Sequence, residues 1–235
     1  MPISQQKIVD DLIKEGQKLW KSPRRQVDFE TGVEEAESLL NDIEQHPHIF
    51  VLACVMDRQI PARKVWIIPF EVGTEVGGFE LRDFTKLSPK RLQKIFADKR
   101  LHRFNTKMAK HFYEVVQWIH TQYGDDVSRI WANNPESASV IRRFLEFKGV
   151  GIKIASMAAN ILARDFKIPM RNYSSIDISP DRQVKKYFIH HGLIRKDARN
   201  EELIFLAREL YPKFPGILDV GAWRGGRDLK KRIKP

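Results

Sequence analysis

Apolar residues recur every three or four positions along much of the chain, which is the spacing of helices that bury one face. Stretches of this kind predict helices over residues 3–20, 33–45, 104–123, 137–147 and 201–210. The two-residue alternation that is typical of half-buried strands is largely missing. The pattern therefore predicts an all-helical fold.

Two segments are harder to assign from the pattern. Residues 49–55 form an unbroken apolar run, I-F-V-L-A-C-V, which fits a buried strand as well as a buried helix. Further along, Gly73, Gly77 and Gly78 predict a loop before Phe84, because clustered glycines are typical of turns.

The stretch F-K-G-V-G-I-K-I-A, residues 147–155, predicts a tight turn between two helices. Glycine accepts left-handed backbone angles without steric cost, so a G-x-G step can end one helix and open the next. The backbone N–H groups of Gly149, Val150 and Gly151 would then be free to hold a phosphate. An isolated G-V-G also fits a plain turn with no ligand.

Lys153 lies near the start of the second predicted helix of this hairpin. Its neighbours along that helix are small or apolar: Ile152, Ile154, Ala155, Ala158, Ala159 and Ile161. Such surroundings would partly desolvate the ammonium and lower its pKa. A lysine in this state can act as a nucleophile. The alternative is a solvated lysine beside a turn, with no catalytic role.

Composition and charge favour a polyanionic partner. The chain has 235 residues, of which 42% are hydrophobic, and a formal net charge of +11. Because a strongly basic protein attracts polyanions, nucleic acid is the leading candidate. Basic residues concentrate between Lys86 and Lys110 and between Arg224 and Lys234. A basic surface without a specific ligand is the alternative.

The single cysteine, Cys54, excludes an internal disulfide and a four-cysteine iron–sulfur or zinc site. No apolar run approaches the roughly 18 residues that cross a bilayer, and the start M-P-I-S-Q-Q-K lacks an apolar signal-peptide core. We therefore expect an intracellular protein, in a cytoplasm or nucleoid or in a nucleus, that does not act at a membrane.

Several segments resemble the DNA glycosylases of the helix-hairpin-helix superfamily, of the endonuclease III type. Residues 147–155 are similar to the family's hairpin, apolar-x-G-V-G-x-K-x-A. Residues 180–188, P-D-R-Q-V-K-K-Y-F, are similar to its catalytic segment, in which an aspartate opens a helix. The helix order before the hairpin is also similar, so the resemblance spans about residues 49–188. It implies that the apolar run 49–55 is a buried helix.

The resemblance implies two helical lobes with a DNA cleft between them. One lobe is continuous, residues 47–171, and contains the hairpin; the other combines residues 1–46 with residues 172–235. Many relatives carry an iron–sulfur cluster near the C-terminus, which this chain lacks the cysteines to hold. No cofactor is expected, although the resemblance leaves open a monovalent cation at the hairpin.

The resemblance also implies a mechanism. Lys153 would attack the sugar C1′ of a nucleotide rotated out of the duplex, expel its base and form a Schiff base that permits strand cleavage. Asp181, ionised at a helix start, would help to deprotonate the lysine and stabilise positive charge on the sugar. Asp177 is the second candidate acid. Pro180 fits the first turn of the helix with Ser179 as its cap, which leaves Asp177 in the preceding loop.

Gln59 follows the apolar run 49–55, at the position where relatives carry a glutamine that contacts DNA. The resemblance implies that this side chain fills the gap left by the rotated nucleotide. Without the resemblance, Gln59 is only part of a helix end before Pro61. The sequence departs from the family at Gln183 and Lys186, where histidine and arginine are frequent.

The resemblance therefore implies a base-excision-repair DNA glycosylase with lyase activity at abasic sites. We expect it to act as a monomer on double-stranded DNA that contains a base lesion or mismatch. The rival function is a non-catalytic DNA-binding protein that uses the hairpin only to grip phosphates. An acid after the hairpin and a lysine within its second helix favour catalysis, because gripping needs neither.

Overall fold

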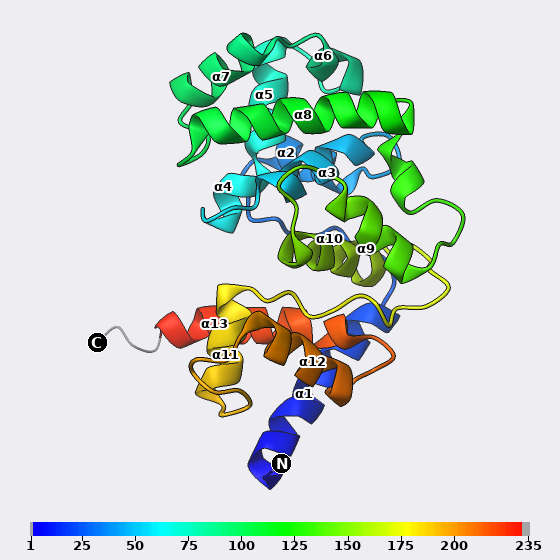
Figure 1. The fold of residues 1–235 in the computed structure, drawn as a ribbon, viewed down its shortest axis with the longest axis vertical. Coiled ribbons are helices and arrows are strands. Elements are labelled where there is room, and N and C mark those ends of the chain that lie inside the picture. Colours follow the sequence, from blue (N-terminus) through cyan, green and yellow to red (C-terminus); the bar gives the residue numbers. More distant parts are fainter. Residues whose placement is uncertain (1, 232–235) are drawn as a thin grey trace. The chain divides into compact units, whose positions relative to one another are not determined.

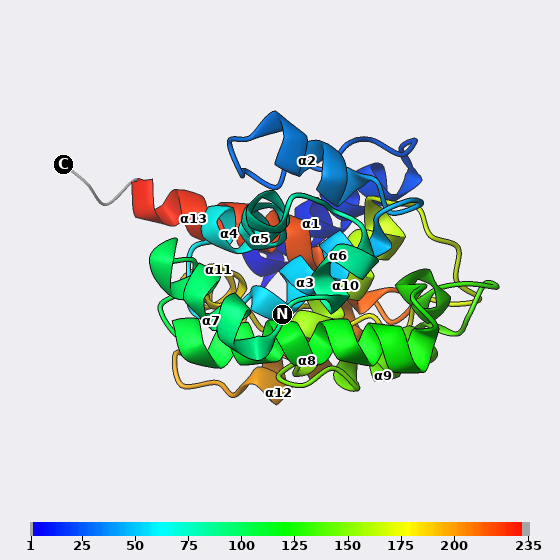
Figure 2. The same ribbon diagram turned by 90° about the horizontal axis from the view of Figure 1, so that it is seen from above.

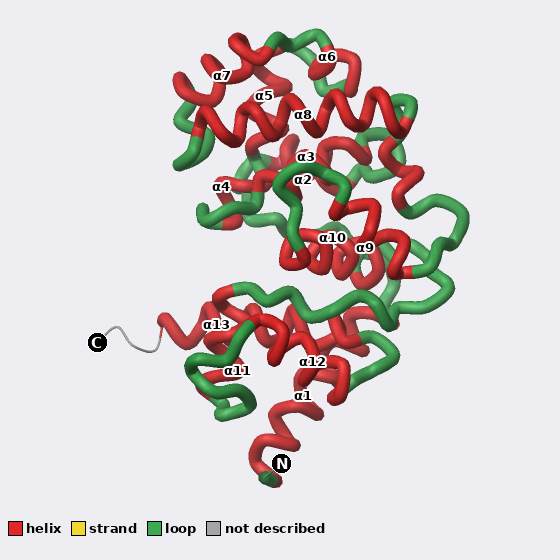
Figure 3. Tube along the Cα trace, viewed as in Figure 1, coloured by secondary structure: helices red, strands yellow, loops and turns green. Residues whose placement is uncertain are grey.

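The computed structural model describes residues 2–231, so residues 232–235, the end of the basic tail, lie outside it. The described residues form helices and loops, with no strand among them (Figure 3). This result confirms the all-helical prediction. In chain order (Figure 1) the elements are α1 (Ile3–Lys21), α2 (Glu34–Asn41), α3 (Pro47–Met56), α4 (Ala62–Trp66), α5 (Ile68–Val76), α6 (Leu81–Thr85), α7 (Pro89–Asp98), α8 (Asn105–Tyr123), η1 (Val127–Ile130), α9 (Ser137–Leu145), α10 (Ile152–Arg164), α11 (Arg182–His190), α12 (Asn200–Leu210), η2 (Pro215–Leu218) and α13 (Asp219–Lys231).

The chain forms two compact units. The first comprises the described parts of Met1–Arg25, Asn134–Arg142 and Gly151–Pro235, and the second comprises Gln26–Asn133 and Arg143–Val150. These bounds differ from the expected ones, because α10 contacts α1 and η2 in the first unit while α2 contacts α3 in the second. The first unit contains both chain ends. The DNA cleft stays a prediction.

Helix α3 is the centre of the second unit. All of its residues, Pro47 to Met56, are buried. A helix that is apolar on every side must be surrounded, and α2, α4, α5, α8 and η1 all contact α3. The apolar run 49–55 is therefore a buried helix and not a strand.

Helix α7 lies alongside α8 in both Figure 1 and Figure 2.

The loop predicted at Gly73 is wrong. Helix α5 runs through Gly73 and ends at Gly77, whose φ of 80° gives the left-handed conformation that stops a helix. Gly73 faces the Phe79 ring, and a Cβ built there would lie 2.4 Å from the ring's Cδ1. This glycine therefore marks a close approach of a side chain and not a turn.

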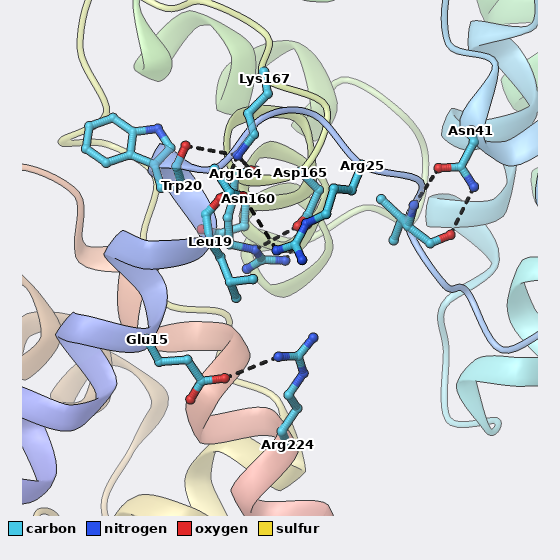
Figure 4. Close-up of polar contacts among 12 residues, drawn as sticks. Glu15, Leu19, Trp20, Arg25, Asn41, Asn160, Arg164, Asp165, Lys167 and Arg224 are labelled. Carbon is cyan, nitrogen blue, oxygen red and sulfur yellow. Dashed lines mark hydrogen bonds and ion pairs between the residues drawn. The ribbon is translucent and has the colours of Figure 1, made fainter.

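In the first unit, α13 contacts α11 and α1, and α10 contacts α1 and η2. Polar contacts fix α1 in this arrangement (Figure 4). Lys167 Nζ donates to the carbonyls of Leu19 and Trp20 at 2.6 and 2.9 Å, which ties the end of α1 to the segment after α10. Glu15 on α1 pairs with Arg224 on α13, Oε1 to Nη1, at 3.2 Å. The N-terminal helix thus supports the elements that carry the site below.

Residues 2–231 contain neither a membrane-spanning helix nor a cluster of metal-ligating side chains. No helix in this range combines the length and apolarity needed to cross a membrane. Nor do three or more His, Cys, Asp or Glu side chains come together there as metal ligands. Cys54 is a free, buried thiol within α3.

Candidate active site

Lys153 and Asp181 lie side by side in the first unit. Lys153 is the second residue of α10, and Asp181 caps the start of α11. Their charged atoms, Nζ and Oδ2, are 3.6 Å apart. The side chains are 33% and 23% exposed, so a ligand has access to both. The structure thus brings together the two residues that the sequence singled out for chemistry.

Asp181 is held by the end of α11. Its backbone is extended, with φ of −74° and ψ of 156°, and its Oδ1 accepts a 2.7 Å hydrogen bond from the backbone N–H of Gln183. The prediction that Ser179 caps this helix is therefore wrong, because the helix begins later and Asp181 itself is the cap. The positive end of the helix dipole favours a carboxylate here, and Oδ2 is left facing the lysine.

Asp177 has a different environment. Its side chain is 4% exposed, and both oxygens accept hydrogen bonds from Arg208, Nε to Oδ1 at 2.7 Å and Nη2 to Oδ2 at 2.9 Å. Its backbone carbonyl accepts another hydrogen bond from Asn160 Nδ2 at 2.9 Å. Asp177 therefore anchors the segment between α10 and α11 to α12. Because Asp177 is buried and paired, the geometry favours Asp181 as the acid that a substrate can reach.

A third acid, Asp219, belongs to the same group and was missed by sequence reasoning. It is the first residue of α13, and its Oδ1 accepts a 3.0 Å hydrogen bond from the backbone N–H of Ser179. Burial raises the pKa of Asp219 to about 7, and the negative charge of Asp181 adds to this, while Arg164, the Ser179 hydrogen bond and Lys153 oppose it. In the sequence, Asp219 is an ordinary acid at a helix start.

At the hairpin only one of the two glycines needs to be glycine. Gly149 has φ of 90°, in the left-handed region, whereas Gly151 is extended, with φ of −116° and ψ of −179°. A Cβ at Gly151 would meet nothing within 4 Å. The N–H of Val150 donates to the carbonyl of Phe147 at 3.0 Å, so the prediction that it is free is wrong. In the described chain, the amides of Gly149 and Gly151 donate to no backbone carbonyl.

In the second unit, the turn that carries Gln59 contacts the hairpin at Gly149 through the adjacent residue, Arg58. Gln59 is exposed and left-handed, with φ of 55°, in the turn between α3 and α4. The adjacent Arg58 donates from Nη2 to the carbonyl of Gly149. The turn that carries Gln59 and the glycine turn of the hairpin are therefore linked by one side chain. The monovalent cation at the hairpin stays a prediction, and one hairpin carbonyl already has Arg58 as its cationic partner.

No protein-family model matches the sequence, and no curated protein sequence matches it significantly. Solved structures do match. A trapped endonuclease III–DNA covalent intermediate, an estranged-adenine complex, is 16% identical with a TM-score of 0.64, over 100% of this chain and 91% of that one.

Two further structures are similar. The Clostridium acetobutylicum 8-oxoguanine glycosylase/lyase, bound to double-stranded DNA with cytosine opposite 8-oxoG, is 14% identical with a TM-score of 0.58, over 89% of this chain and 72% of that one. MBOgg1 in complex with a low-affinity DNA ligand is 14% identical with a TM-score of 0.59, over 97% and 70%. The chain therefore has the all-helical fold of these solved structures, among them endonuclease III and an 8-oxoguanine glycosylase/lyase.

Proposed function

We propose that the protein is a base-excision-repair DNA glycosylase that also cleaves the strand at the resulting abasic site. The observation that carries this proposal is the 3.6 Å approach of Lys153 Nζ to Asp181 Oδ2, with both side chains partly exposed. A nucleophile within reach of a base is the arrangement that covalent catalysis requires. The similar fold of endonuclease III trapped in a covalent intermediate with DNA supports a covalent route.

In the proposed reaction, the Lys153 amine attacks C1′ of a nucleotide rotated out of the duplex. The C1′–N bond to the base breaks, and the base leaves with the bonding electron pair and takes up a proton. The C1′–O4′ bond then opens, O4′ takes the amine's proton, and a Schiff base remains. Loss of a proton from C2′ expels the 3′ phosphate with its electron pair, which cuts the strand.

Asp181 would act twice in this sequence. As a base, it would accept the proton that Lys153 must lose before it can attack. As a fixed negative charge, it would stabilise the positive charge that develops on the sugar when the bond to the base breaks. The cap hydrogen bond from Gln183 holds one oxygen in place at 2.7 Å, so the carboxylate does not have to be reoriented between the two steps.

The remaining proposed contacts concern DNA. The amides of Gly149 and Gly151 would donate to a backbone phosphate, and the exposed Gln59 would fill the space that the rotated nucleotide leaves. The net charge of +11 would strengthen binding to double-stranded DNA without selecting a sequence. We propose that the enzyme acts as a monomer inside the cell.

The test is a panel of duplexes, each with one lesion, mismatch or abasic site, scored for base release, nicking and trapping by borohydride. Wild-type protein should be trapped on at least one duplex, because reduction converts a Schiff base into a stable amine. Lys153→Gln should abolish trapping and keep the fold. Lys196→Gln, which removes an exposed lysine of the same unit, is the matched control and should be trapped as well as wild type.

Two results would contradict the proposal. Trapping that persists in Lys153→Gln would assign the nucleophile to another amine. Wild-type protein that binds every duplex but neither releases a base nor nicks any of them would support the rival function, a DNA-binding protein that grips phosphates with its hairpin.

A further inference from the structure

Ser179 connects the three charged residues of the candidate site. Its N–H donates to Asp219 Oδ1 at 3.0 Å, and its Oγ donates to the backbone carbonyl of Lys153 at 3.2 Å. Its own carbonyl accepts a 2.6 Å hydrogen bond from the N–H of Asp181. Ser179 is only 3% exposed, so water does not compete freely for these bonds. Ser179 is thus hydrogen-bonded to all three residues.

The charged groups that act on Asp219 lie on α10 and at the start of α11. Helix α10 contributes Lys153 and Arg164, and the start of α11 contributes Asp181. Further along α13, Arg224 pairs with Glu15 on α1, and the carbonyl of Gly226 accepts a hydrogen bond from Lys186 on α11. Asp219 thus interacts electrostatically with both members of the Lys153–Asp181 pair.

We propose that Asp219 is a positioning residue that acts through Ser179 on the Lys153–Asp181 pair, and that a negative charge on Asp219 slows the attack by Lys153. The inference rests on the proposed lysine chemistry. When protonated, Asp219 still offers Oδ1 to Ser179 and adds no charge. When ionised, it places a second negative charge beside Lys153, which favours the ammonium over the free amine.

The key variant is Asp219→Asn, which keeps an oxygen for Ser179 and removes the charge. The measurement is single-turnover nicking of duplex DNA with an abasic site, over pH values from about 5.5 to about 9. The abasic substrate makes the result independent of which base the enzyme removes. The wild-type rate should rise with pH and flatten near pH 7, where Asp219 ionises. The asparagine variant should rise without this break, equal wild type at low pH and exceed it above pH 7.

Two further variants separate charge from position. Asp219→Ala removes the acceptor as well, so nicking should fall by about tenfold or more at every pH. Asp197→Asn, which removes an exposed negative charge from the same unit, should keep the wild-type profile. A break near pH 7 that persists in Asp219→Asn would overturn the proposal. So would an asparagine variant as slow as the alanine variant at every pH.

A second readout needs no activity. The pKa of Asp219 is about 7 in the folded protein against 3.8 for a free side chain, so the folded state keeps a proton that the unfolded state loses. Wild-type stability should therefore fall, relative to Asp219→Asn, as pH rises from about 4 through about 7. If this difference appears but no duplex is nicked, the proposed function fails and the titration of Asp219 stands. If melting curves of both proteins stay parallel across this range, the inference fails.

Discussion

Replacing Asp177 or Asp181 by asparagine should separate stability from chemistry. Asp177 is 4% exposed and accepts two hydrogen bonds from Arg208, at 2.7 and 2.9 Å. Asparagine can offer only one oxygen, and its amide group would face the guanidinium donors. Removing one partner of a buried ion pair costs about 3 to 5 kcal/mol, and we expect about 3 for Asp177→Asn because Arg208 is half-exposed. For a chain of this size the melting temperature should fall by roughly 6 to 12 °C.

The same change at Asp181 should have the opposite profile. Asparagine caps a helix as well as aspartate does, so the hydrogen bond from Gln183 survives and the melting temperature should change by less than about 2 °C. The loss of the charge removes the base beside Lys153, and single-turnover base release should fall by about 10² to 10⁴. DNA binding should stay close to wild type.

Both variants are to be measured by thermal melting and by single-turnover base release on a duplex that wild-type protein processes. Arg208→Gln is the matched control, because it breaks the same ion pair from its exposed side and should lower the melting temperature without touching the lysine. The reasoning is refuted if Asp177→Asn melts like wild type and loses activity by orders of magnitude. That result would make Asp177 the catalytic acid and Asp181 a cap alone.

Two further predictions concern the second unit and the hairpin. Gly149→Ala should weaken DNA binding and cost about 1 to 2 kcal/mol of stability, because the φ of Gly149 is 90° and a Cβ there would lie 3.0 Å from Arg58 Nη2. Gly151→Ala should bind DNA and melt like wild type, because a Cβ there meets nothing within 4 Å. Equal effects at the two positions, in melting and in a binding titration, would contradict this. Gln59→Ala should slow base release more than it weakens binding to undamaged DNA, and unchanged release would make Gln59 only a helix end.

The residues that sequence reasoning placed correctly are those whose position depends on local signals. Lys153 follows a glycine turn, and Asp181 opens a helix whose apolar Val184 and Phe188 are buried on one face. Helix starts and glycine turns are set by interactions within a few residues, so a single sequence carries them. The family's spacing then identifies the two residues as a pair, and in the structure their charged atoms are 3.6 Å apart.

The errors arose where tertiary contacts override a local rule. The glycine pattern predicts a loop at Gly73, yet this residue lies within α5, where the Phe79 ring takes the space of a side chain. The G-V-G pattern does not distinguish its two glycines, yet only Gly149 is left-handed, whereas Gly151 is extended and its Cβ position is open. Glycine signals either unusual backbone angles or close packing, and composition alone does not distinguish the two.

The contribution of Asp219 lay beyond sequence reasoning for a deeper reason. Ser179 bonds to Lys153 across 26 residues of sequence and to Asp219 across 40, so no local window contains the group. Asp219 is the first residue of α13, and desolvation there raises its pKa to about 7. The candidate site therefore includes a residue of α13, a helix that begins well after both the hairpin and the segment that carries Asp181. The family resemblance covers about residues 49–188, so it gives no information about Asp219.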